Sequence, residues 1–335
     1  MSIWARSLKE RESHVTSPSP PPVRTSFTSS PPSMAPKQTH SVTLGAGDAL
    51  GTGDSYLKLN VLPTELSAIA FDRLKQEVRW AVMHHRGGEV PRLVAVEGEV
   101  LPDGSFPIYR HPADFSPPLL VFSPTVSVIR THVEAAIGHP LNHVLIQLYR
   151  NGADYISDHS DKTIDVVHGS SIVNVSLGAQ RVMVLRNKKV PNTTSEDTAI
   201  ARPPPRPTQR IPLPHNSLFV LGPNTNSSWL HGIPHDNRPL TIKSADEQAM
   251  GGERISLTFR HIGTFLTNDG AGSEPQRIFG QGAKGKTRDD AGVVLKGEAE
   301  SAGMREAFGR ENQMSGEEWD WERWYGEGFD VVDLV

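Results

Sequence analysis

Residues 171–186 have the sequence Ser-Ile-Val-Asn-Val-Ser-Leu-Gly-Ala-Gln-Arg-Val-Met-Val-Leu-Arg. Two short β-branched runs are separated here by Gly178, Ala179 and Gln180, and such runs with turn residues between them are typical of strands. Similar runs lie on both sides of it, and turn residues separate them. These runs are HVLIQLY (143–149), SLFVLG (217–222), SSWLHG (227–232) and RISLTFRHI (254–262). The pattern predicts an antiparallel sandwich or barrel.

Two helices are predicted before the strands. The first begins after Pro63 and keeps a 3.6-residue apolar period as far as His84. Its apolar positions are Leu66, Ile69, Leu74, Val78, Ala81 and Val82. The second begins at Pro124 and ends at Gly138. Residues 187–216 are rich in proline and are predicted to be an inserted loop, because proline is excluded from central strands. We therefore expect an α+β, mainly β domain with N-terminal helices.

The composition limits the chemistry that this chain can perform. It has 335 residues, no cysteine and fourteen histidines. Disulfide-stapled modules, thiolate zinc sites and cysteine nucleophiles are excluded, so a metal would need His, Asp, Glu or backbone oxygen ligands. No apolar run approaches the length of about 18 residues that a membrane span needs, and the N-terminus lacks the apolar core of a secretory signal. We expect a soluble, intracellular chain, nuclear or cytoplasmic, with no membrane partner.

Three unlike regions follow one another along the chain. Residues 1–54 are rich in Ser, Thr and Pro and are predicted to be a disordered tail. Residues 55–266 contain the predicted helices and strands and form the candidate catalytic domain, with loop 187–216 inserted. Residues 267–335 carry eight basic and fifteen acidic residues and are predicted to be an acidic tail. The tail ends in an aromatic cluster, which we expect to pack on the barrel as a helix rather than to bind a separate partner. The cluster is formed by Trp319, Trp321, Trp324 and Tyr325.

The charge of the chain does not argue against a polyanionic partner. The whole chain has a formal charge of −4, but the middle region holds 21 basic and 19 acidic residues. The part that is expected to fold is therefore slightly basic, and this leaves nucleic acid open as a partner.

His159-Ser160-Asp161 is the strongest candidate for chemistry in a cysteine-free β domain. Side chains at i and i+2 of an extended chain point the same way, so an imidazole and a carboxylate there can bind one ion. An exposed loop histidine beside a solvated aspartate is the alternative. His132-Val133-Glu134 has the same spacing, but it lies in the second predicted helix, where positions i and i+2 are about 200° apart and cannot chelate.

A metal site of this kind needs a third donor that closes one face of an octahedron. His231 is predicted to be that donor, because it ends a strand and precedes a Gly/Pro turn. His235 is its competitor.

The segment Arg254-Ile-Ser-Leu-Thr-Phe-Arg260 adds positive charge. On a strand, Arg254, Ser256, Thr258 and Arg260 share one face, and the apolar residues between them share the other. Two arginines inside a small barrel would need anions, and the guanidinium fork suits a carboxylate. The alternative is an edge strand with both arginines in water.

These motifs together resemble the AlkB-type Fe(II)/2-oxoglutarate dioxygenases, which repair alkylated nucleic-acid bases. The resemblance covers residues 90–262, and its most specific part is the closing strand with its two arginines. In chain order the matching residues are Tyr149, His159-x-Asp161, Asn174-Val-Ser-Leu-Gly178, Trp229-Leu-His231 and Arg254-x-Ser-Leu-Thr-Phe-Arg260. The resemblance implies a double-stranded β-helix, a jelly-roll, cupin-like core flanked by the N-terminal helices.

The resemblance also implies the cofactors Fe(II), 2-oxoglutarate and O₂. His159, Asp161 and His231 would hold the iron and would be the catalytic residues. Arg254 and Tyr149 would bind the far carboxylate of 2-oxoglutarate, and Arg260 would lie against the near carboxylate or the substrate pocket. The residues assigned in this way to 2-oxoglutarate are Arg254, Arg260, Tyr149 and Gln147, where the last replaces a common asparagine.

The substrate residues follow from the same resemblance. A base in a duplex must be flipped out to reach the iron. Tyr109 would stack on that base opposite His159. Thr163 stands two positions after Asp161, where family members that act on bases carry an acidic residue, and its hydroxyl would accept one hydrogen bond.

Three functions are compatible with these observations. The first is a monomeric demethylase of alkylated bases in DNA or RNA, which releases formaldehyde, succinate and CO₂. The second, suggested by Lys162 and Thr163, is a 2-oxoglutarate-dependent hydroxylase or demethylase of a protein or small molecule. The third is a non-catalytic binding module, against which the complete triad argues. Salt dependence separates the first two, because phosphate contacts release counterions.

Overall fold

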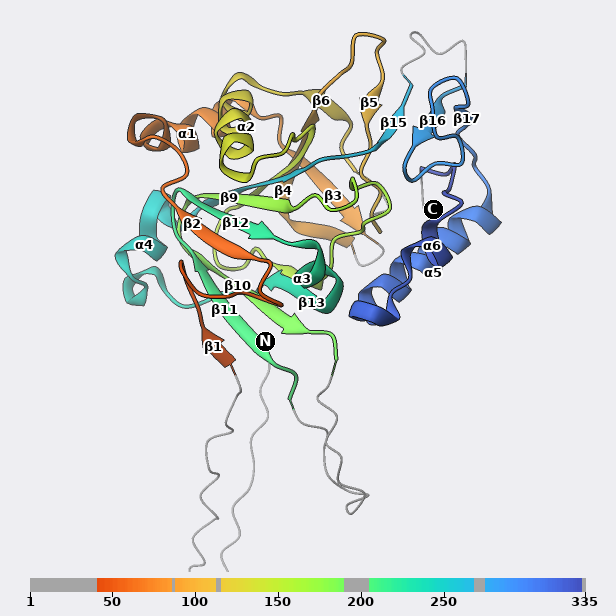
Figure 1. Ribbon diagram of the computed structural model, residues 1–335. Helices are drawn as coiled ribbons and strands as arrows, with labels where there is room; N and C mark the ends of the chain where they lie inside the picture. The colour runs from red at the N-terminus through yellow and green to blue at the C-terminus, as the bar shows by residue number, and fades with distance from the viewer. Residues whose placement is uncertain (1–40, 86–87, 113–115, 190–204, 268–274, 333–335) are drawn as a thin grey trace, which may run out of the picture. The chain divides into compact units, whose positions relative to one another are not determined.

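Two mainly antiparallel β-sheets face each other across the core of the protein (Figure 1). The computed structural model describes residues 41–85, 88–112, 116–189, 205–267 and 275–332. In spatial order the larger sheet contains β2 (Tyr56–Leu59), β12 (Ser217–Leu221), β9 (Ile172–Gly178), β14 (Arg254–Arg260), β7 (His143–Tyr149), β4 (Gly88–Gly98) and β3 (Ala81–His85), with β6 (Leu119–Val121) beside β4. The smaller sheet contains β1 (Ser41–Thr43), β11 (Thr208–Leu213), β10 (Arg181–Asn187), β13 (Trp229–Ile233) and β8 (Ile156–His159). This arrangement is the expected jelly-roll. The expected strand runs are found, except that Ser227 and Ser228 end the helix Pro223–Ser228 and the strand β13 begins at Trp229.

The remaining elements are a small sheet and the helices. The small sheet contains β17 (Gly292–Val293), β16 (Arg277–Gly280), β15 (Thr264–Leu266) and β5 (Phe106–Pro107). The α-helices are α1 (Thr64–Glu77), α2 (Pro124–Ile137), α3 (Pro223–Ser228), α4 (Ala245–Gln248), α5 (Glu298–Gln313) and α6 (Trp321–Tyr325). Short 3₁₀ turns occur at Leu240–Ile242, Ala249–Gly252 and Gly316–Glu318. Among the described residues, none of these helices is both long enough and apolar enough to span a membrane.

The strands at the centre of the larger sheet are buried on both faces. In β14, Ile255, Leu257 and Phe259 belong to the apolar core that α1 and α2 cover. The alternate residues Arg254 and Arg260 line a cavity between the two sheets. Because successive side chains of a strand point to opposite faces, one strand contributes to the core and to the cavity at once. The predicted division of this strand into an apolar and a polar face is confirmed.

Helices α1 and α2 lie on the outer side of the larger sheet (Figure 1). Helix α2 has the predicted bounds, with Pro124 in its first turn, where a missing N–H costs no helix bond. It ends at Gly138, which has a left-handed φ of 80°. That conformation favours glycine and terminates the helix.

Helix α1 is shorter than predicted. It ends at Glu77, and the expected helical residues Ala81, Val82 and His84 belong to β3 instead. Ala81 pairs with Val94 of β4, so the chain in this region completes the edge of the larger sheet. Ile69, an expected core position, is 41% exposed. Tertiary strand pairing outweighs the helical period here.

The proline-rich segment 187–216 is also not entirely a loop, contrary to the prediction. Thr208–Leu213 forms β11, which pairs with β10 on one side. On the other side β1 pairs only with Thr208, Gln209 and Arg210. Pro212 therefore lies where β11 has a single neighbouring strand, and proline is tolerated there. The predicted loop residues 190–204 lie outside the described part of the chain, as do residues 1–40 of the predicted N-terminal tail. Residues 41–54 of that tail contain β1.

The acidic segment after residue 274 is folded and is not an extended tail. Helices α5 and α6 form an apolar cluster with Ile164, in which Met304, Phe308 and Tyr325 are buried. Trp321 packs edge-on against His168 with 4.4 Å between ring centroids. Of the expected aromatic cluster, Trp321, Trp324 and Tyr325 lie in α6, whereas Trp319 precedes that helix and packs against the same apolar cluster.

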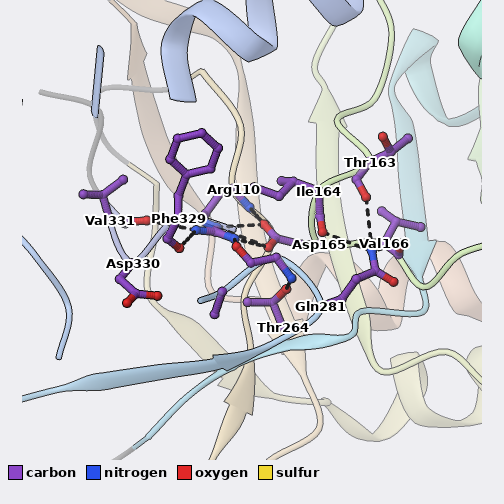
Figure 2. A network of polar contacts seen from close by, with 12 residues as sticks. Arg110, Thr163, Ile164, Asp165, Val166, Thr264, Gln281, Phe329, Asp330 and Val331 are labelled. Atoms are coloured by element: carbon purple, nitrogen blue, oxygen red, sulfur yellow. Dashed lines mark hydrogen bonds and ion pairs between the residues drawn. The ribbon is translucent and has the colours of Figure 1, made fainter. Parts of the chain in front are cut away.

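A buried arginine attaches this C-terminal segment to the barrel. Figure 2 shows the Arg110 side chain between Asp165 and the carbonyl groups of Phe329 and Val331. The Arg110 Nη2 to Asp165 Oδ1 distance is 2.6 Å, and both side chains are at most 1% exposed. Arg110 Nη1 donates to the carbonyl oxygens of Phe329 at 2.6 Å and Val331 at 3.1 Å. The guanidinium thus joins three separate parts of the chain.

Candidate active site

The structure brings the three predicted metal ligands together. His159 ends β8, Asp161 follows in the next loop, and His231 lies on β13, directly opposite His159 in the strand register. One candidate ligand atom from each residue lies within 4.8 Å of those of the other two. His235 is exposed, and its ring contacts Tyr155 at a centroid distance of 3.9 Å, outside this cluster. Of the two candidates for the third donor, His231 is therefore the one near His159 and Asp161.

The hydrogen bonds of these side chains leave the correct atoms free for a metal. His159 Nδ1 lies 2.8 Å from the carbonyl oxygen of Ser157, so Nδ1 carries the proton and Nε2 is free to bind a cation. Asp161 Oδ2 accepts a hydrogen bond from Arg260 Nη2 at 2.8 Å, and its other oxygen lies 3.8 Å from His159 Nε2. The free atoms thus converge on one point.

The electrostatic environment keeps the three groups in their ligand forms. Burial would raise the pKa of Asp161, but Arg260 and the two histidines outweigh it and hold that pKa well below its usual range. Burial and the neighbouring His159 lower the pKa of His231 to about 3. A carboxylate and neutral imidazoles at neutral pH are the forms that bind a divalent metal.

A cavity of about 390 Å³ opens next to this cluster. Its volume lies within the range of about 300–1,000 Å³ that is usual for small-molecule sites. The cavity is lined by residues from both sheets and from the C-terminal segment. The polar and charged lining residues include Glu89, Arg92, Tyr109, Gln147, Tyr149, His159, Asp161, Lys162, His231, Arg254, Arg260 and Asn312.

Arg254 is fixed at one end and free at the other. Its Nη2 donates to Asn174 Oδ1 at 3.0 Å and Ser176 Oγ at 2.7 Å. Its Nε and Nη1 are buried and have no partner among the described residues. Burial lowers the pKa of Arg254 to about 10, so the side chain is still cationic at neutral pH. A buried cation with two unused donors requires an anion, and a carboxylate supplies the matching acceptors.

Tyr149 and Gln147 lie beside Arg254 on the neighbouring strand. Tyr149 is directly opposite Arg254 in the register, and its ring centroid lies 5.2 Å from the guanidinium carbon. With its amide oxygen turned toward Arg92, Gln147 accepts from Arg92 Nε at 2.9 Å. Sequence reasoning missed Arg92, which is 6% exposed and lies on β4 without a recognisable motif around it.

Arg260 connects the metal cluster with Tyr109. Its Nε and Nη1 are buried without partners in the described part of the chain, while Nη2 holds Asp161. Its guanidinium lies 3.9 Å from the centroid of the Tyr109 ring, and the Tyr109 hydroxyl accepts a hydrogen bond from the Lys162 backbone N–H at 3.0 Å. Tyr109 is therefore part of the cavity lining.

Thr163, by contrast, is not among the cavity-lining residues. Its hydroxyl donates to Glu311 Oε1 at 2.5 Å, and its backbone N–H donates to the same oxygen at 3.0 Å. Glu311 and its neighbour Asn312 come from α5, and Asn312 lines the cavity. No local motif marks these two residues, and sequence reasoning missed them because it treated their segment as a tail.

The donor set fits an Fe(II) and 2-oxoglutarate site. Two imidazoles and one carboxylate are the ligands of the facial triad of non-haem iron oxygenases. The unpaired buried nitrogens of Arg254 and Arg260 can receive the two carboxylates of a dicarboxylic keto acid. The side chains that the structure brings together are thus complementary to both groups.

Comparisons with known proteins agree with this geometry. The family model of the 2OG-Fe(II) oxygenase superfamily matches residues 54–260, more than half of the chain. The human protein named DNA oxidative demethylase ALKBH2 is 34% identical over 140 residues, which are 42% of this chain and 46% of that protein. The human alpha-ketoglutarate-dependent dioxygenase alkB homolog 3 is 27% identical over 198 residues, 57% of this chain and 60% of that protein.

The matched region spans about half the length of these curated relatives. Among solved structures, the one described as the structure of OsALKBH1 covers 62% of this chain and 98% of its own, with a TM-score of 0.39 and 15% identity.

Proposed function

Because this chain belongs to the 2OG-Fe(II) oxygenase superfamily, we propose that it is a dioxygenase that demethylates alkylated nucleobases in DNA. The observation that carries the proposal is the cluster of His159, Asp161 and His231 at a cavity of about 390 Å³ that also holds unpaired arginine donors. The names of the curated relatives, a DNA oxidative demethylase and an alkB homolog, support the substrate class.

The metal and cosubstrate supply the oxidising chemistry. When bound, Fe(II) with 2-oxoglutarate activates O₂ to hydroxylate the N-methyl carbon of the base, so that succinate, CO₂, formaldehyde and the free base are produced. The protein's part is to bind, orient and keep water out.

His159, Asp161 and His231 are proposed to hold the metal. Arg260 positions the Asp161 carboxylate through its 2.8 Å hydrogen bond, which leaves Oδ1 for the metal. The backbone carbonyl oxygen of Ser157 fixes the orientation of the His159 ring, because it accepts a hydrogen bond from the Nδ1–H group. Both contacts hold the ligand side chains in the binding geometry before the metal binds. They therefore reduce the conformational entropy that these side chains lose on binding.

Arg254 is proposed to bind the far carboxylate of 2-oxoglutarate, and Asn174 and Ser176 keep its guanidinium in place. Tyr149 and Gln147 form the adjacent wall. Arg260 is proposed to bind the near carboxylate through its unused nitrogens. Tyr109 supplies an aromatic surface for a base that has left the helical stack.

The test is a single-turnover experiment. The protein is loaded with Fe(II) and 2-oxoglutarate without oxygen and then exposed to oxygen with methylated single- and double-stranded DNA and RNA oligonucleotides. Mass spectrometry should detect loss of the methyl group, and formaldehyde should appear in equal amount. Asp161→Ala should abolish turnover. Decarboxylation of 2-oxoglutarate with no product on any oligonucleotide would refute the nucleobase substrate.

A hydroxylase or demethylase of a protein or small molecule is the second candidate. Two observations favour it: the Lys162 side chain lines the cavity, and Thr163 stands at the position, two after Asp161, where family members that act on bases carry an acidic residue. Salt separates the two candidates, because phosphate contacts make the binding of DNA fall steeply as salt rises. A nuclear or cytoplasmic location and a monomeric state stay predictions that rest on the proposed substrate.

A further inference from the structure

Asn312 brings a side chain from the C-terminal helix α5 into the cavity. Its Oδ1 accepts three hydrogen bonds, from Ser160 N at 3.1 Å, Ser160 Oγ at 2.9 Å and Lys162 Nζ at 2.7 Å. The amide oxygen is the only acceptor atom of an asparagine side chain, and an ammonium group can only donate. These three bonds therefore fix the orientation of the amide. The group that Asn312 can still offer to a ligand is Nδ2, which has no hydrogen-bond partner within the described chain.

The carboxylate next to Asn312 is fully used. Glu311 Oε1 accepts from Thr163, and Glu311 Oε2 accepts from the Tyr325 hydroxyl at 2.8 Å. Lys162 Nζ lies 3.8 Å from Glu311 Oε2. Glu311 is 2% exposed and is not among the cavity-lining residues. The helix thus places a carboxylate behind the wall and an amide donor in it.

The charge of the cavity favours a neutral base with a hydrogen-bond acceptor over a positively charged base. Its described lining includes the cations Arg92, Lys162, Arg254 and Arg260 and the carboxylates of Asp161 and Glu89. Arg254 and Arg260 are the proposed partners of 2-oxoglutarate, and Glu311, the carboxylate nearest to Lys162, lies behind the wall. Asp161 is paired with Arg260 and is a proposed metal ligand, and Glu89 is exposed with its side chain 73% accessible. A positively charged ring would meet Lys162 without a free buried carboxylate to balance it.

We propose that Asn312 is a specificity-determining residue whose Nδ2 donates to a carbonyl oxygen of the substrate base. The inference rests on the proposed function and deepens it by naming the substrate class. Methylation at N3 of thymine or uracil leaves a neutral ring with two carbonyl acceptors. Methylation at N1 of adenine leaves a cation with an exocyclic amine, whose N–H groups would face the Asn312 donor. Two facing donors both lose their hydrogen bonds, which disfavours the cationic base.

The test compares kcat/KM on single-stranded oligonucleotides that are identical except for N3-methylthymine or N1-methyladenine. The kcat/KM of the wild-type protein should be about tenfold or more higher on N3-methylthymine. That ratio corresponds to the loss of one hydrogen bond by a group that is left unpaired. Asn312→Asp replaces Nδ2 with an acceptor oxygen of the same shape and should shift the ratio toward N1-methyladenine by about tenfold.

Gln313→Glu is the matched control. Gln313 is the next residue on α5, is exposed and does not line the cavity, and the substitution makes the same change of charge. It should leave the ratio unchanged. The relative affinities of the two oligonucleotides, measured by fluorescence anisotropy with Mn(II) in place of Fe(II) and without oxygen, should change in the same direction as the rate ratio.

Two outcomes would overturn the inference while demethylation stands. One is a wild-type preference for N1-methyladenine, which would refute the proposed role of Asn312 even if the Asn312→Asp protein fails to fold. The other is an unchanged ratio in a folded Asn312→Asp protein, with folding judged by its thermal midpoint against Gln313→Glu. Decarboxylation without any oligonucleotide product would instead refute the proposed function, so the two failures are distinguishable.

Discussion

Arg254 shows how one residue can be both structural and functional. One nitrogen of its guanidinium donates hydrogen bonds to Asn174 and Ser176, while its two other nitrogens are buried and have no partner in the described chain. Leaving buried donors unpaired costs free energy, and a carboxylate that binds there supplies the matching acceptors. This makes Arg254 the best single position to test for cosubstrate binding.

Arg254→Met should weaken 2-oxoglutarate binding by about 2 kcal/mol or more, roughly thirtyfold, because it removes a buried charged partner of the carboxylate. The measurement is the KM for 2-oxoglutarate, together with titration calorimetry of 2-oxoglutarate into the Mn(II)-loaded protein. Arg210→Met, at an exposed position of β11, is the control and should change neither value. Equal KM values for Arg254→Met and wild type would contradict the assignment.

His143 provides a test that depends on pH. It is 3% exposed on β7, and its Nδ1 has no partner among the described residues. Burial, with the nearby Arg260 and His111, lowers the pKa of His143 well below its ordinary value of 6.5. The folded protein therefore keeps this ring neutral at a pH at which the unfolded chain already binds a proton. Since the unfolded state then holds more protons, stability must fall as the pH drops below about 6.5.

His143→Asn should remove this contribution. The free energy of unfolding of the variant should vary less steeply between pH 6.5 and 5 than that of wild type, by up to about 1.4 kcal/mol per pH unit. Urea denaturation at several pH values, at one fixed metal concentration, measures both slopes. Parallel curves for the two proteins would show that His143 is not held neutral.

At the scale of elements, the attachment of the C-terminal segment depends on Arg110. The pair with Asp165 is buried, so removing one partner leaves an uncompensated charge. Arg110→Met should cost about 3–5 kcal/mol of unfolding free energy and should increase hydrogen exchange in α5 and α6 before it does so in the barrel.

Arg288→Met is the matched control for this change. Arg288 forms an ion pair with Asp103 at 2.8 Å, but both side chains are about 40% exposed. Exposed pairs contribute at most about 1 kcal/mol, so exchange in α5 should stay at the wild-type level. If Arg110→Met and Arg288→Met destabilised the protein equally, the anchoring role of Arg110 would be wrong.

The elements that could be predicted from sequence are those with local signals. Helix α2 has a proline in its first turn and a glycine at its end, and β14 alternates apolar and polar residues over its whole length. The His159-x-Asp161 spacing is equally local. By contrast, β3 exists because Ala81 finds Val94, and β11 exists because β10 lies beside it. Such pairings depend on strands that are separate in the sequence, and the periodicity of one segment does not reveal them.

The same reason explains what was missed in the site. Asn312 reaches Lys162 across 150 positions of sequence, and Glu311 reaches Thr163 across 148. Nothing near either residue marks it as part of a cavity. Composition alone suggested an acidic tail, although the Glu311 carboxylate is buried beside Lys162 and the Glu311 carbonyl oxygen accepts a hydrogen bond from Lys188.

At the scale of the whole molecule, metal binding should be coupled to global stability. A ligand that binds only the folded state stabilises it by about 2.7 kcal/mol at a concentration one hundred times its Kd. Adding Mn(II) should therefore raise the thermal midpoint, and a chelator should reverse the rise. Asp161→Asn should reduce this metal-induced shift strongly.

Asp158→Asn is the control for this measurement. Asp158 lies next to His159 on β8 but pairs with Arg186 at 2.8 Å and is not part of the ligand cluster. Its metal-induced shift should equal that of wild type. The comparison uses the shift and not the midpoint itself, because Asp161→Asn also leaves Arg260 without its counter-charge.

The place of Asn312 in the sequence has a consequence for the synthesis of the protein. A ribosome makes the chain from the N-terminus, so the triad and the strand that ends at Arg260 emerge well before α5. Phe329 and Val331, whose carbonyl groups accept hydrogen bonds from Arg110, are made later still. During synthesis the proposed metal ligands are therefore expected to be present before Asn312, the residue proposed to discriminate among bases.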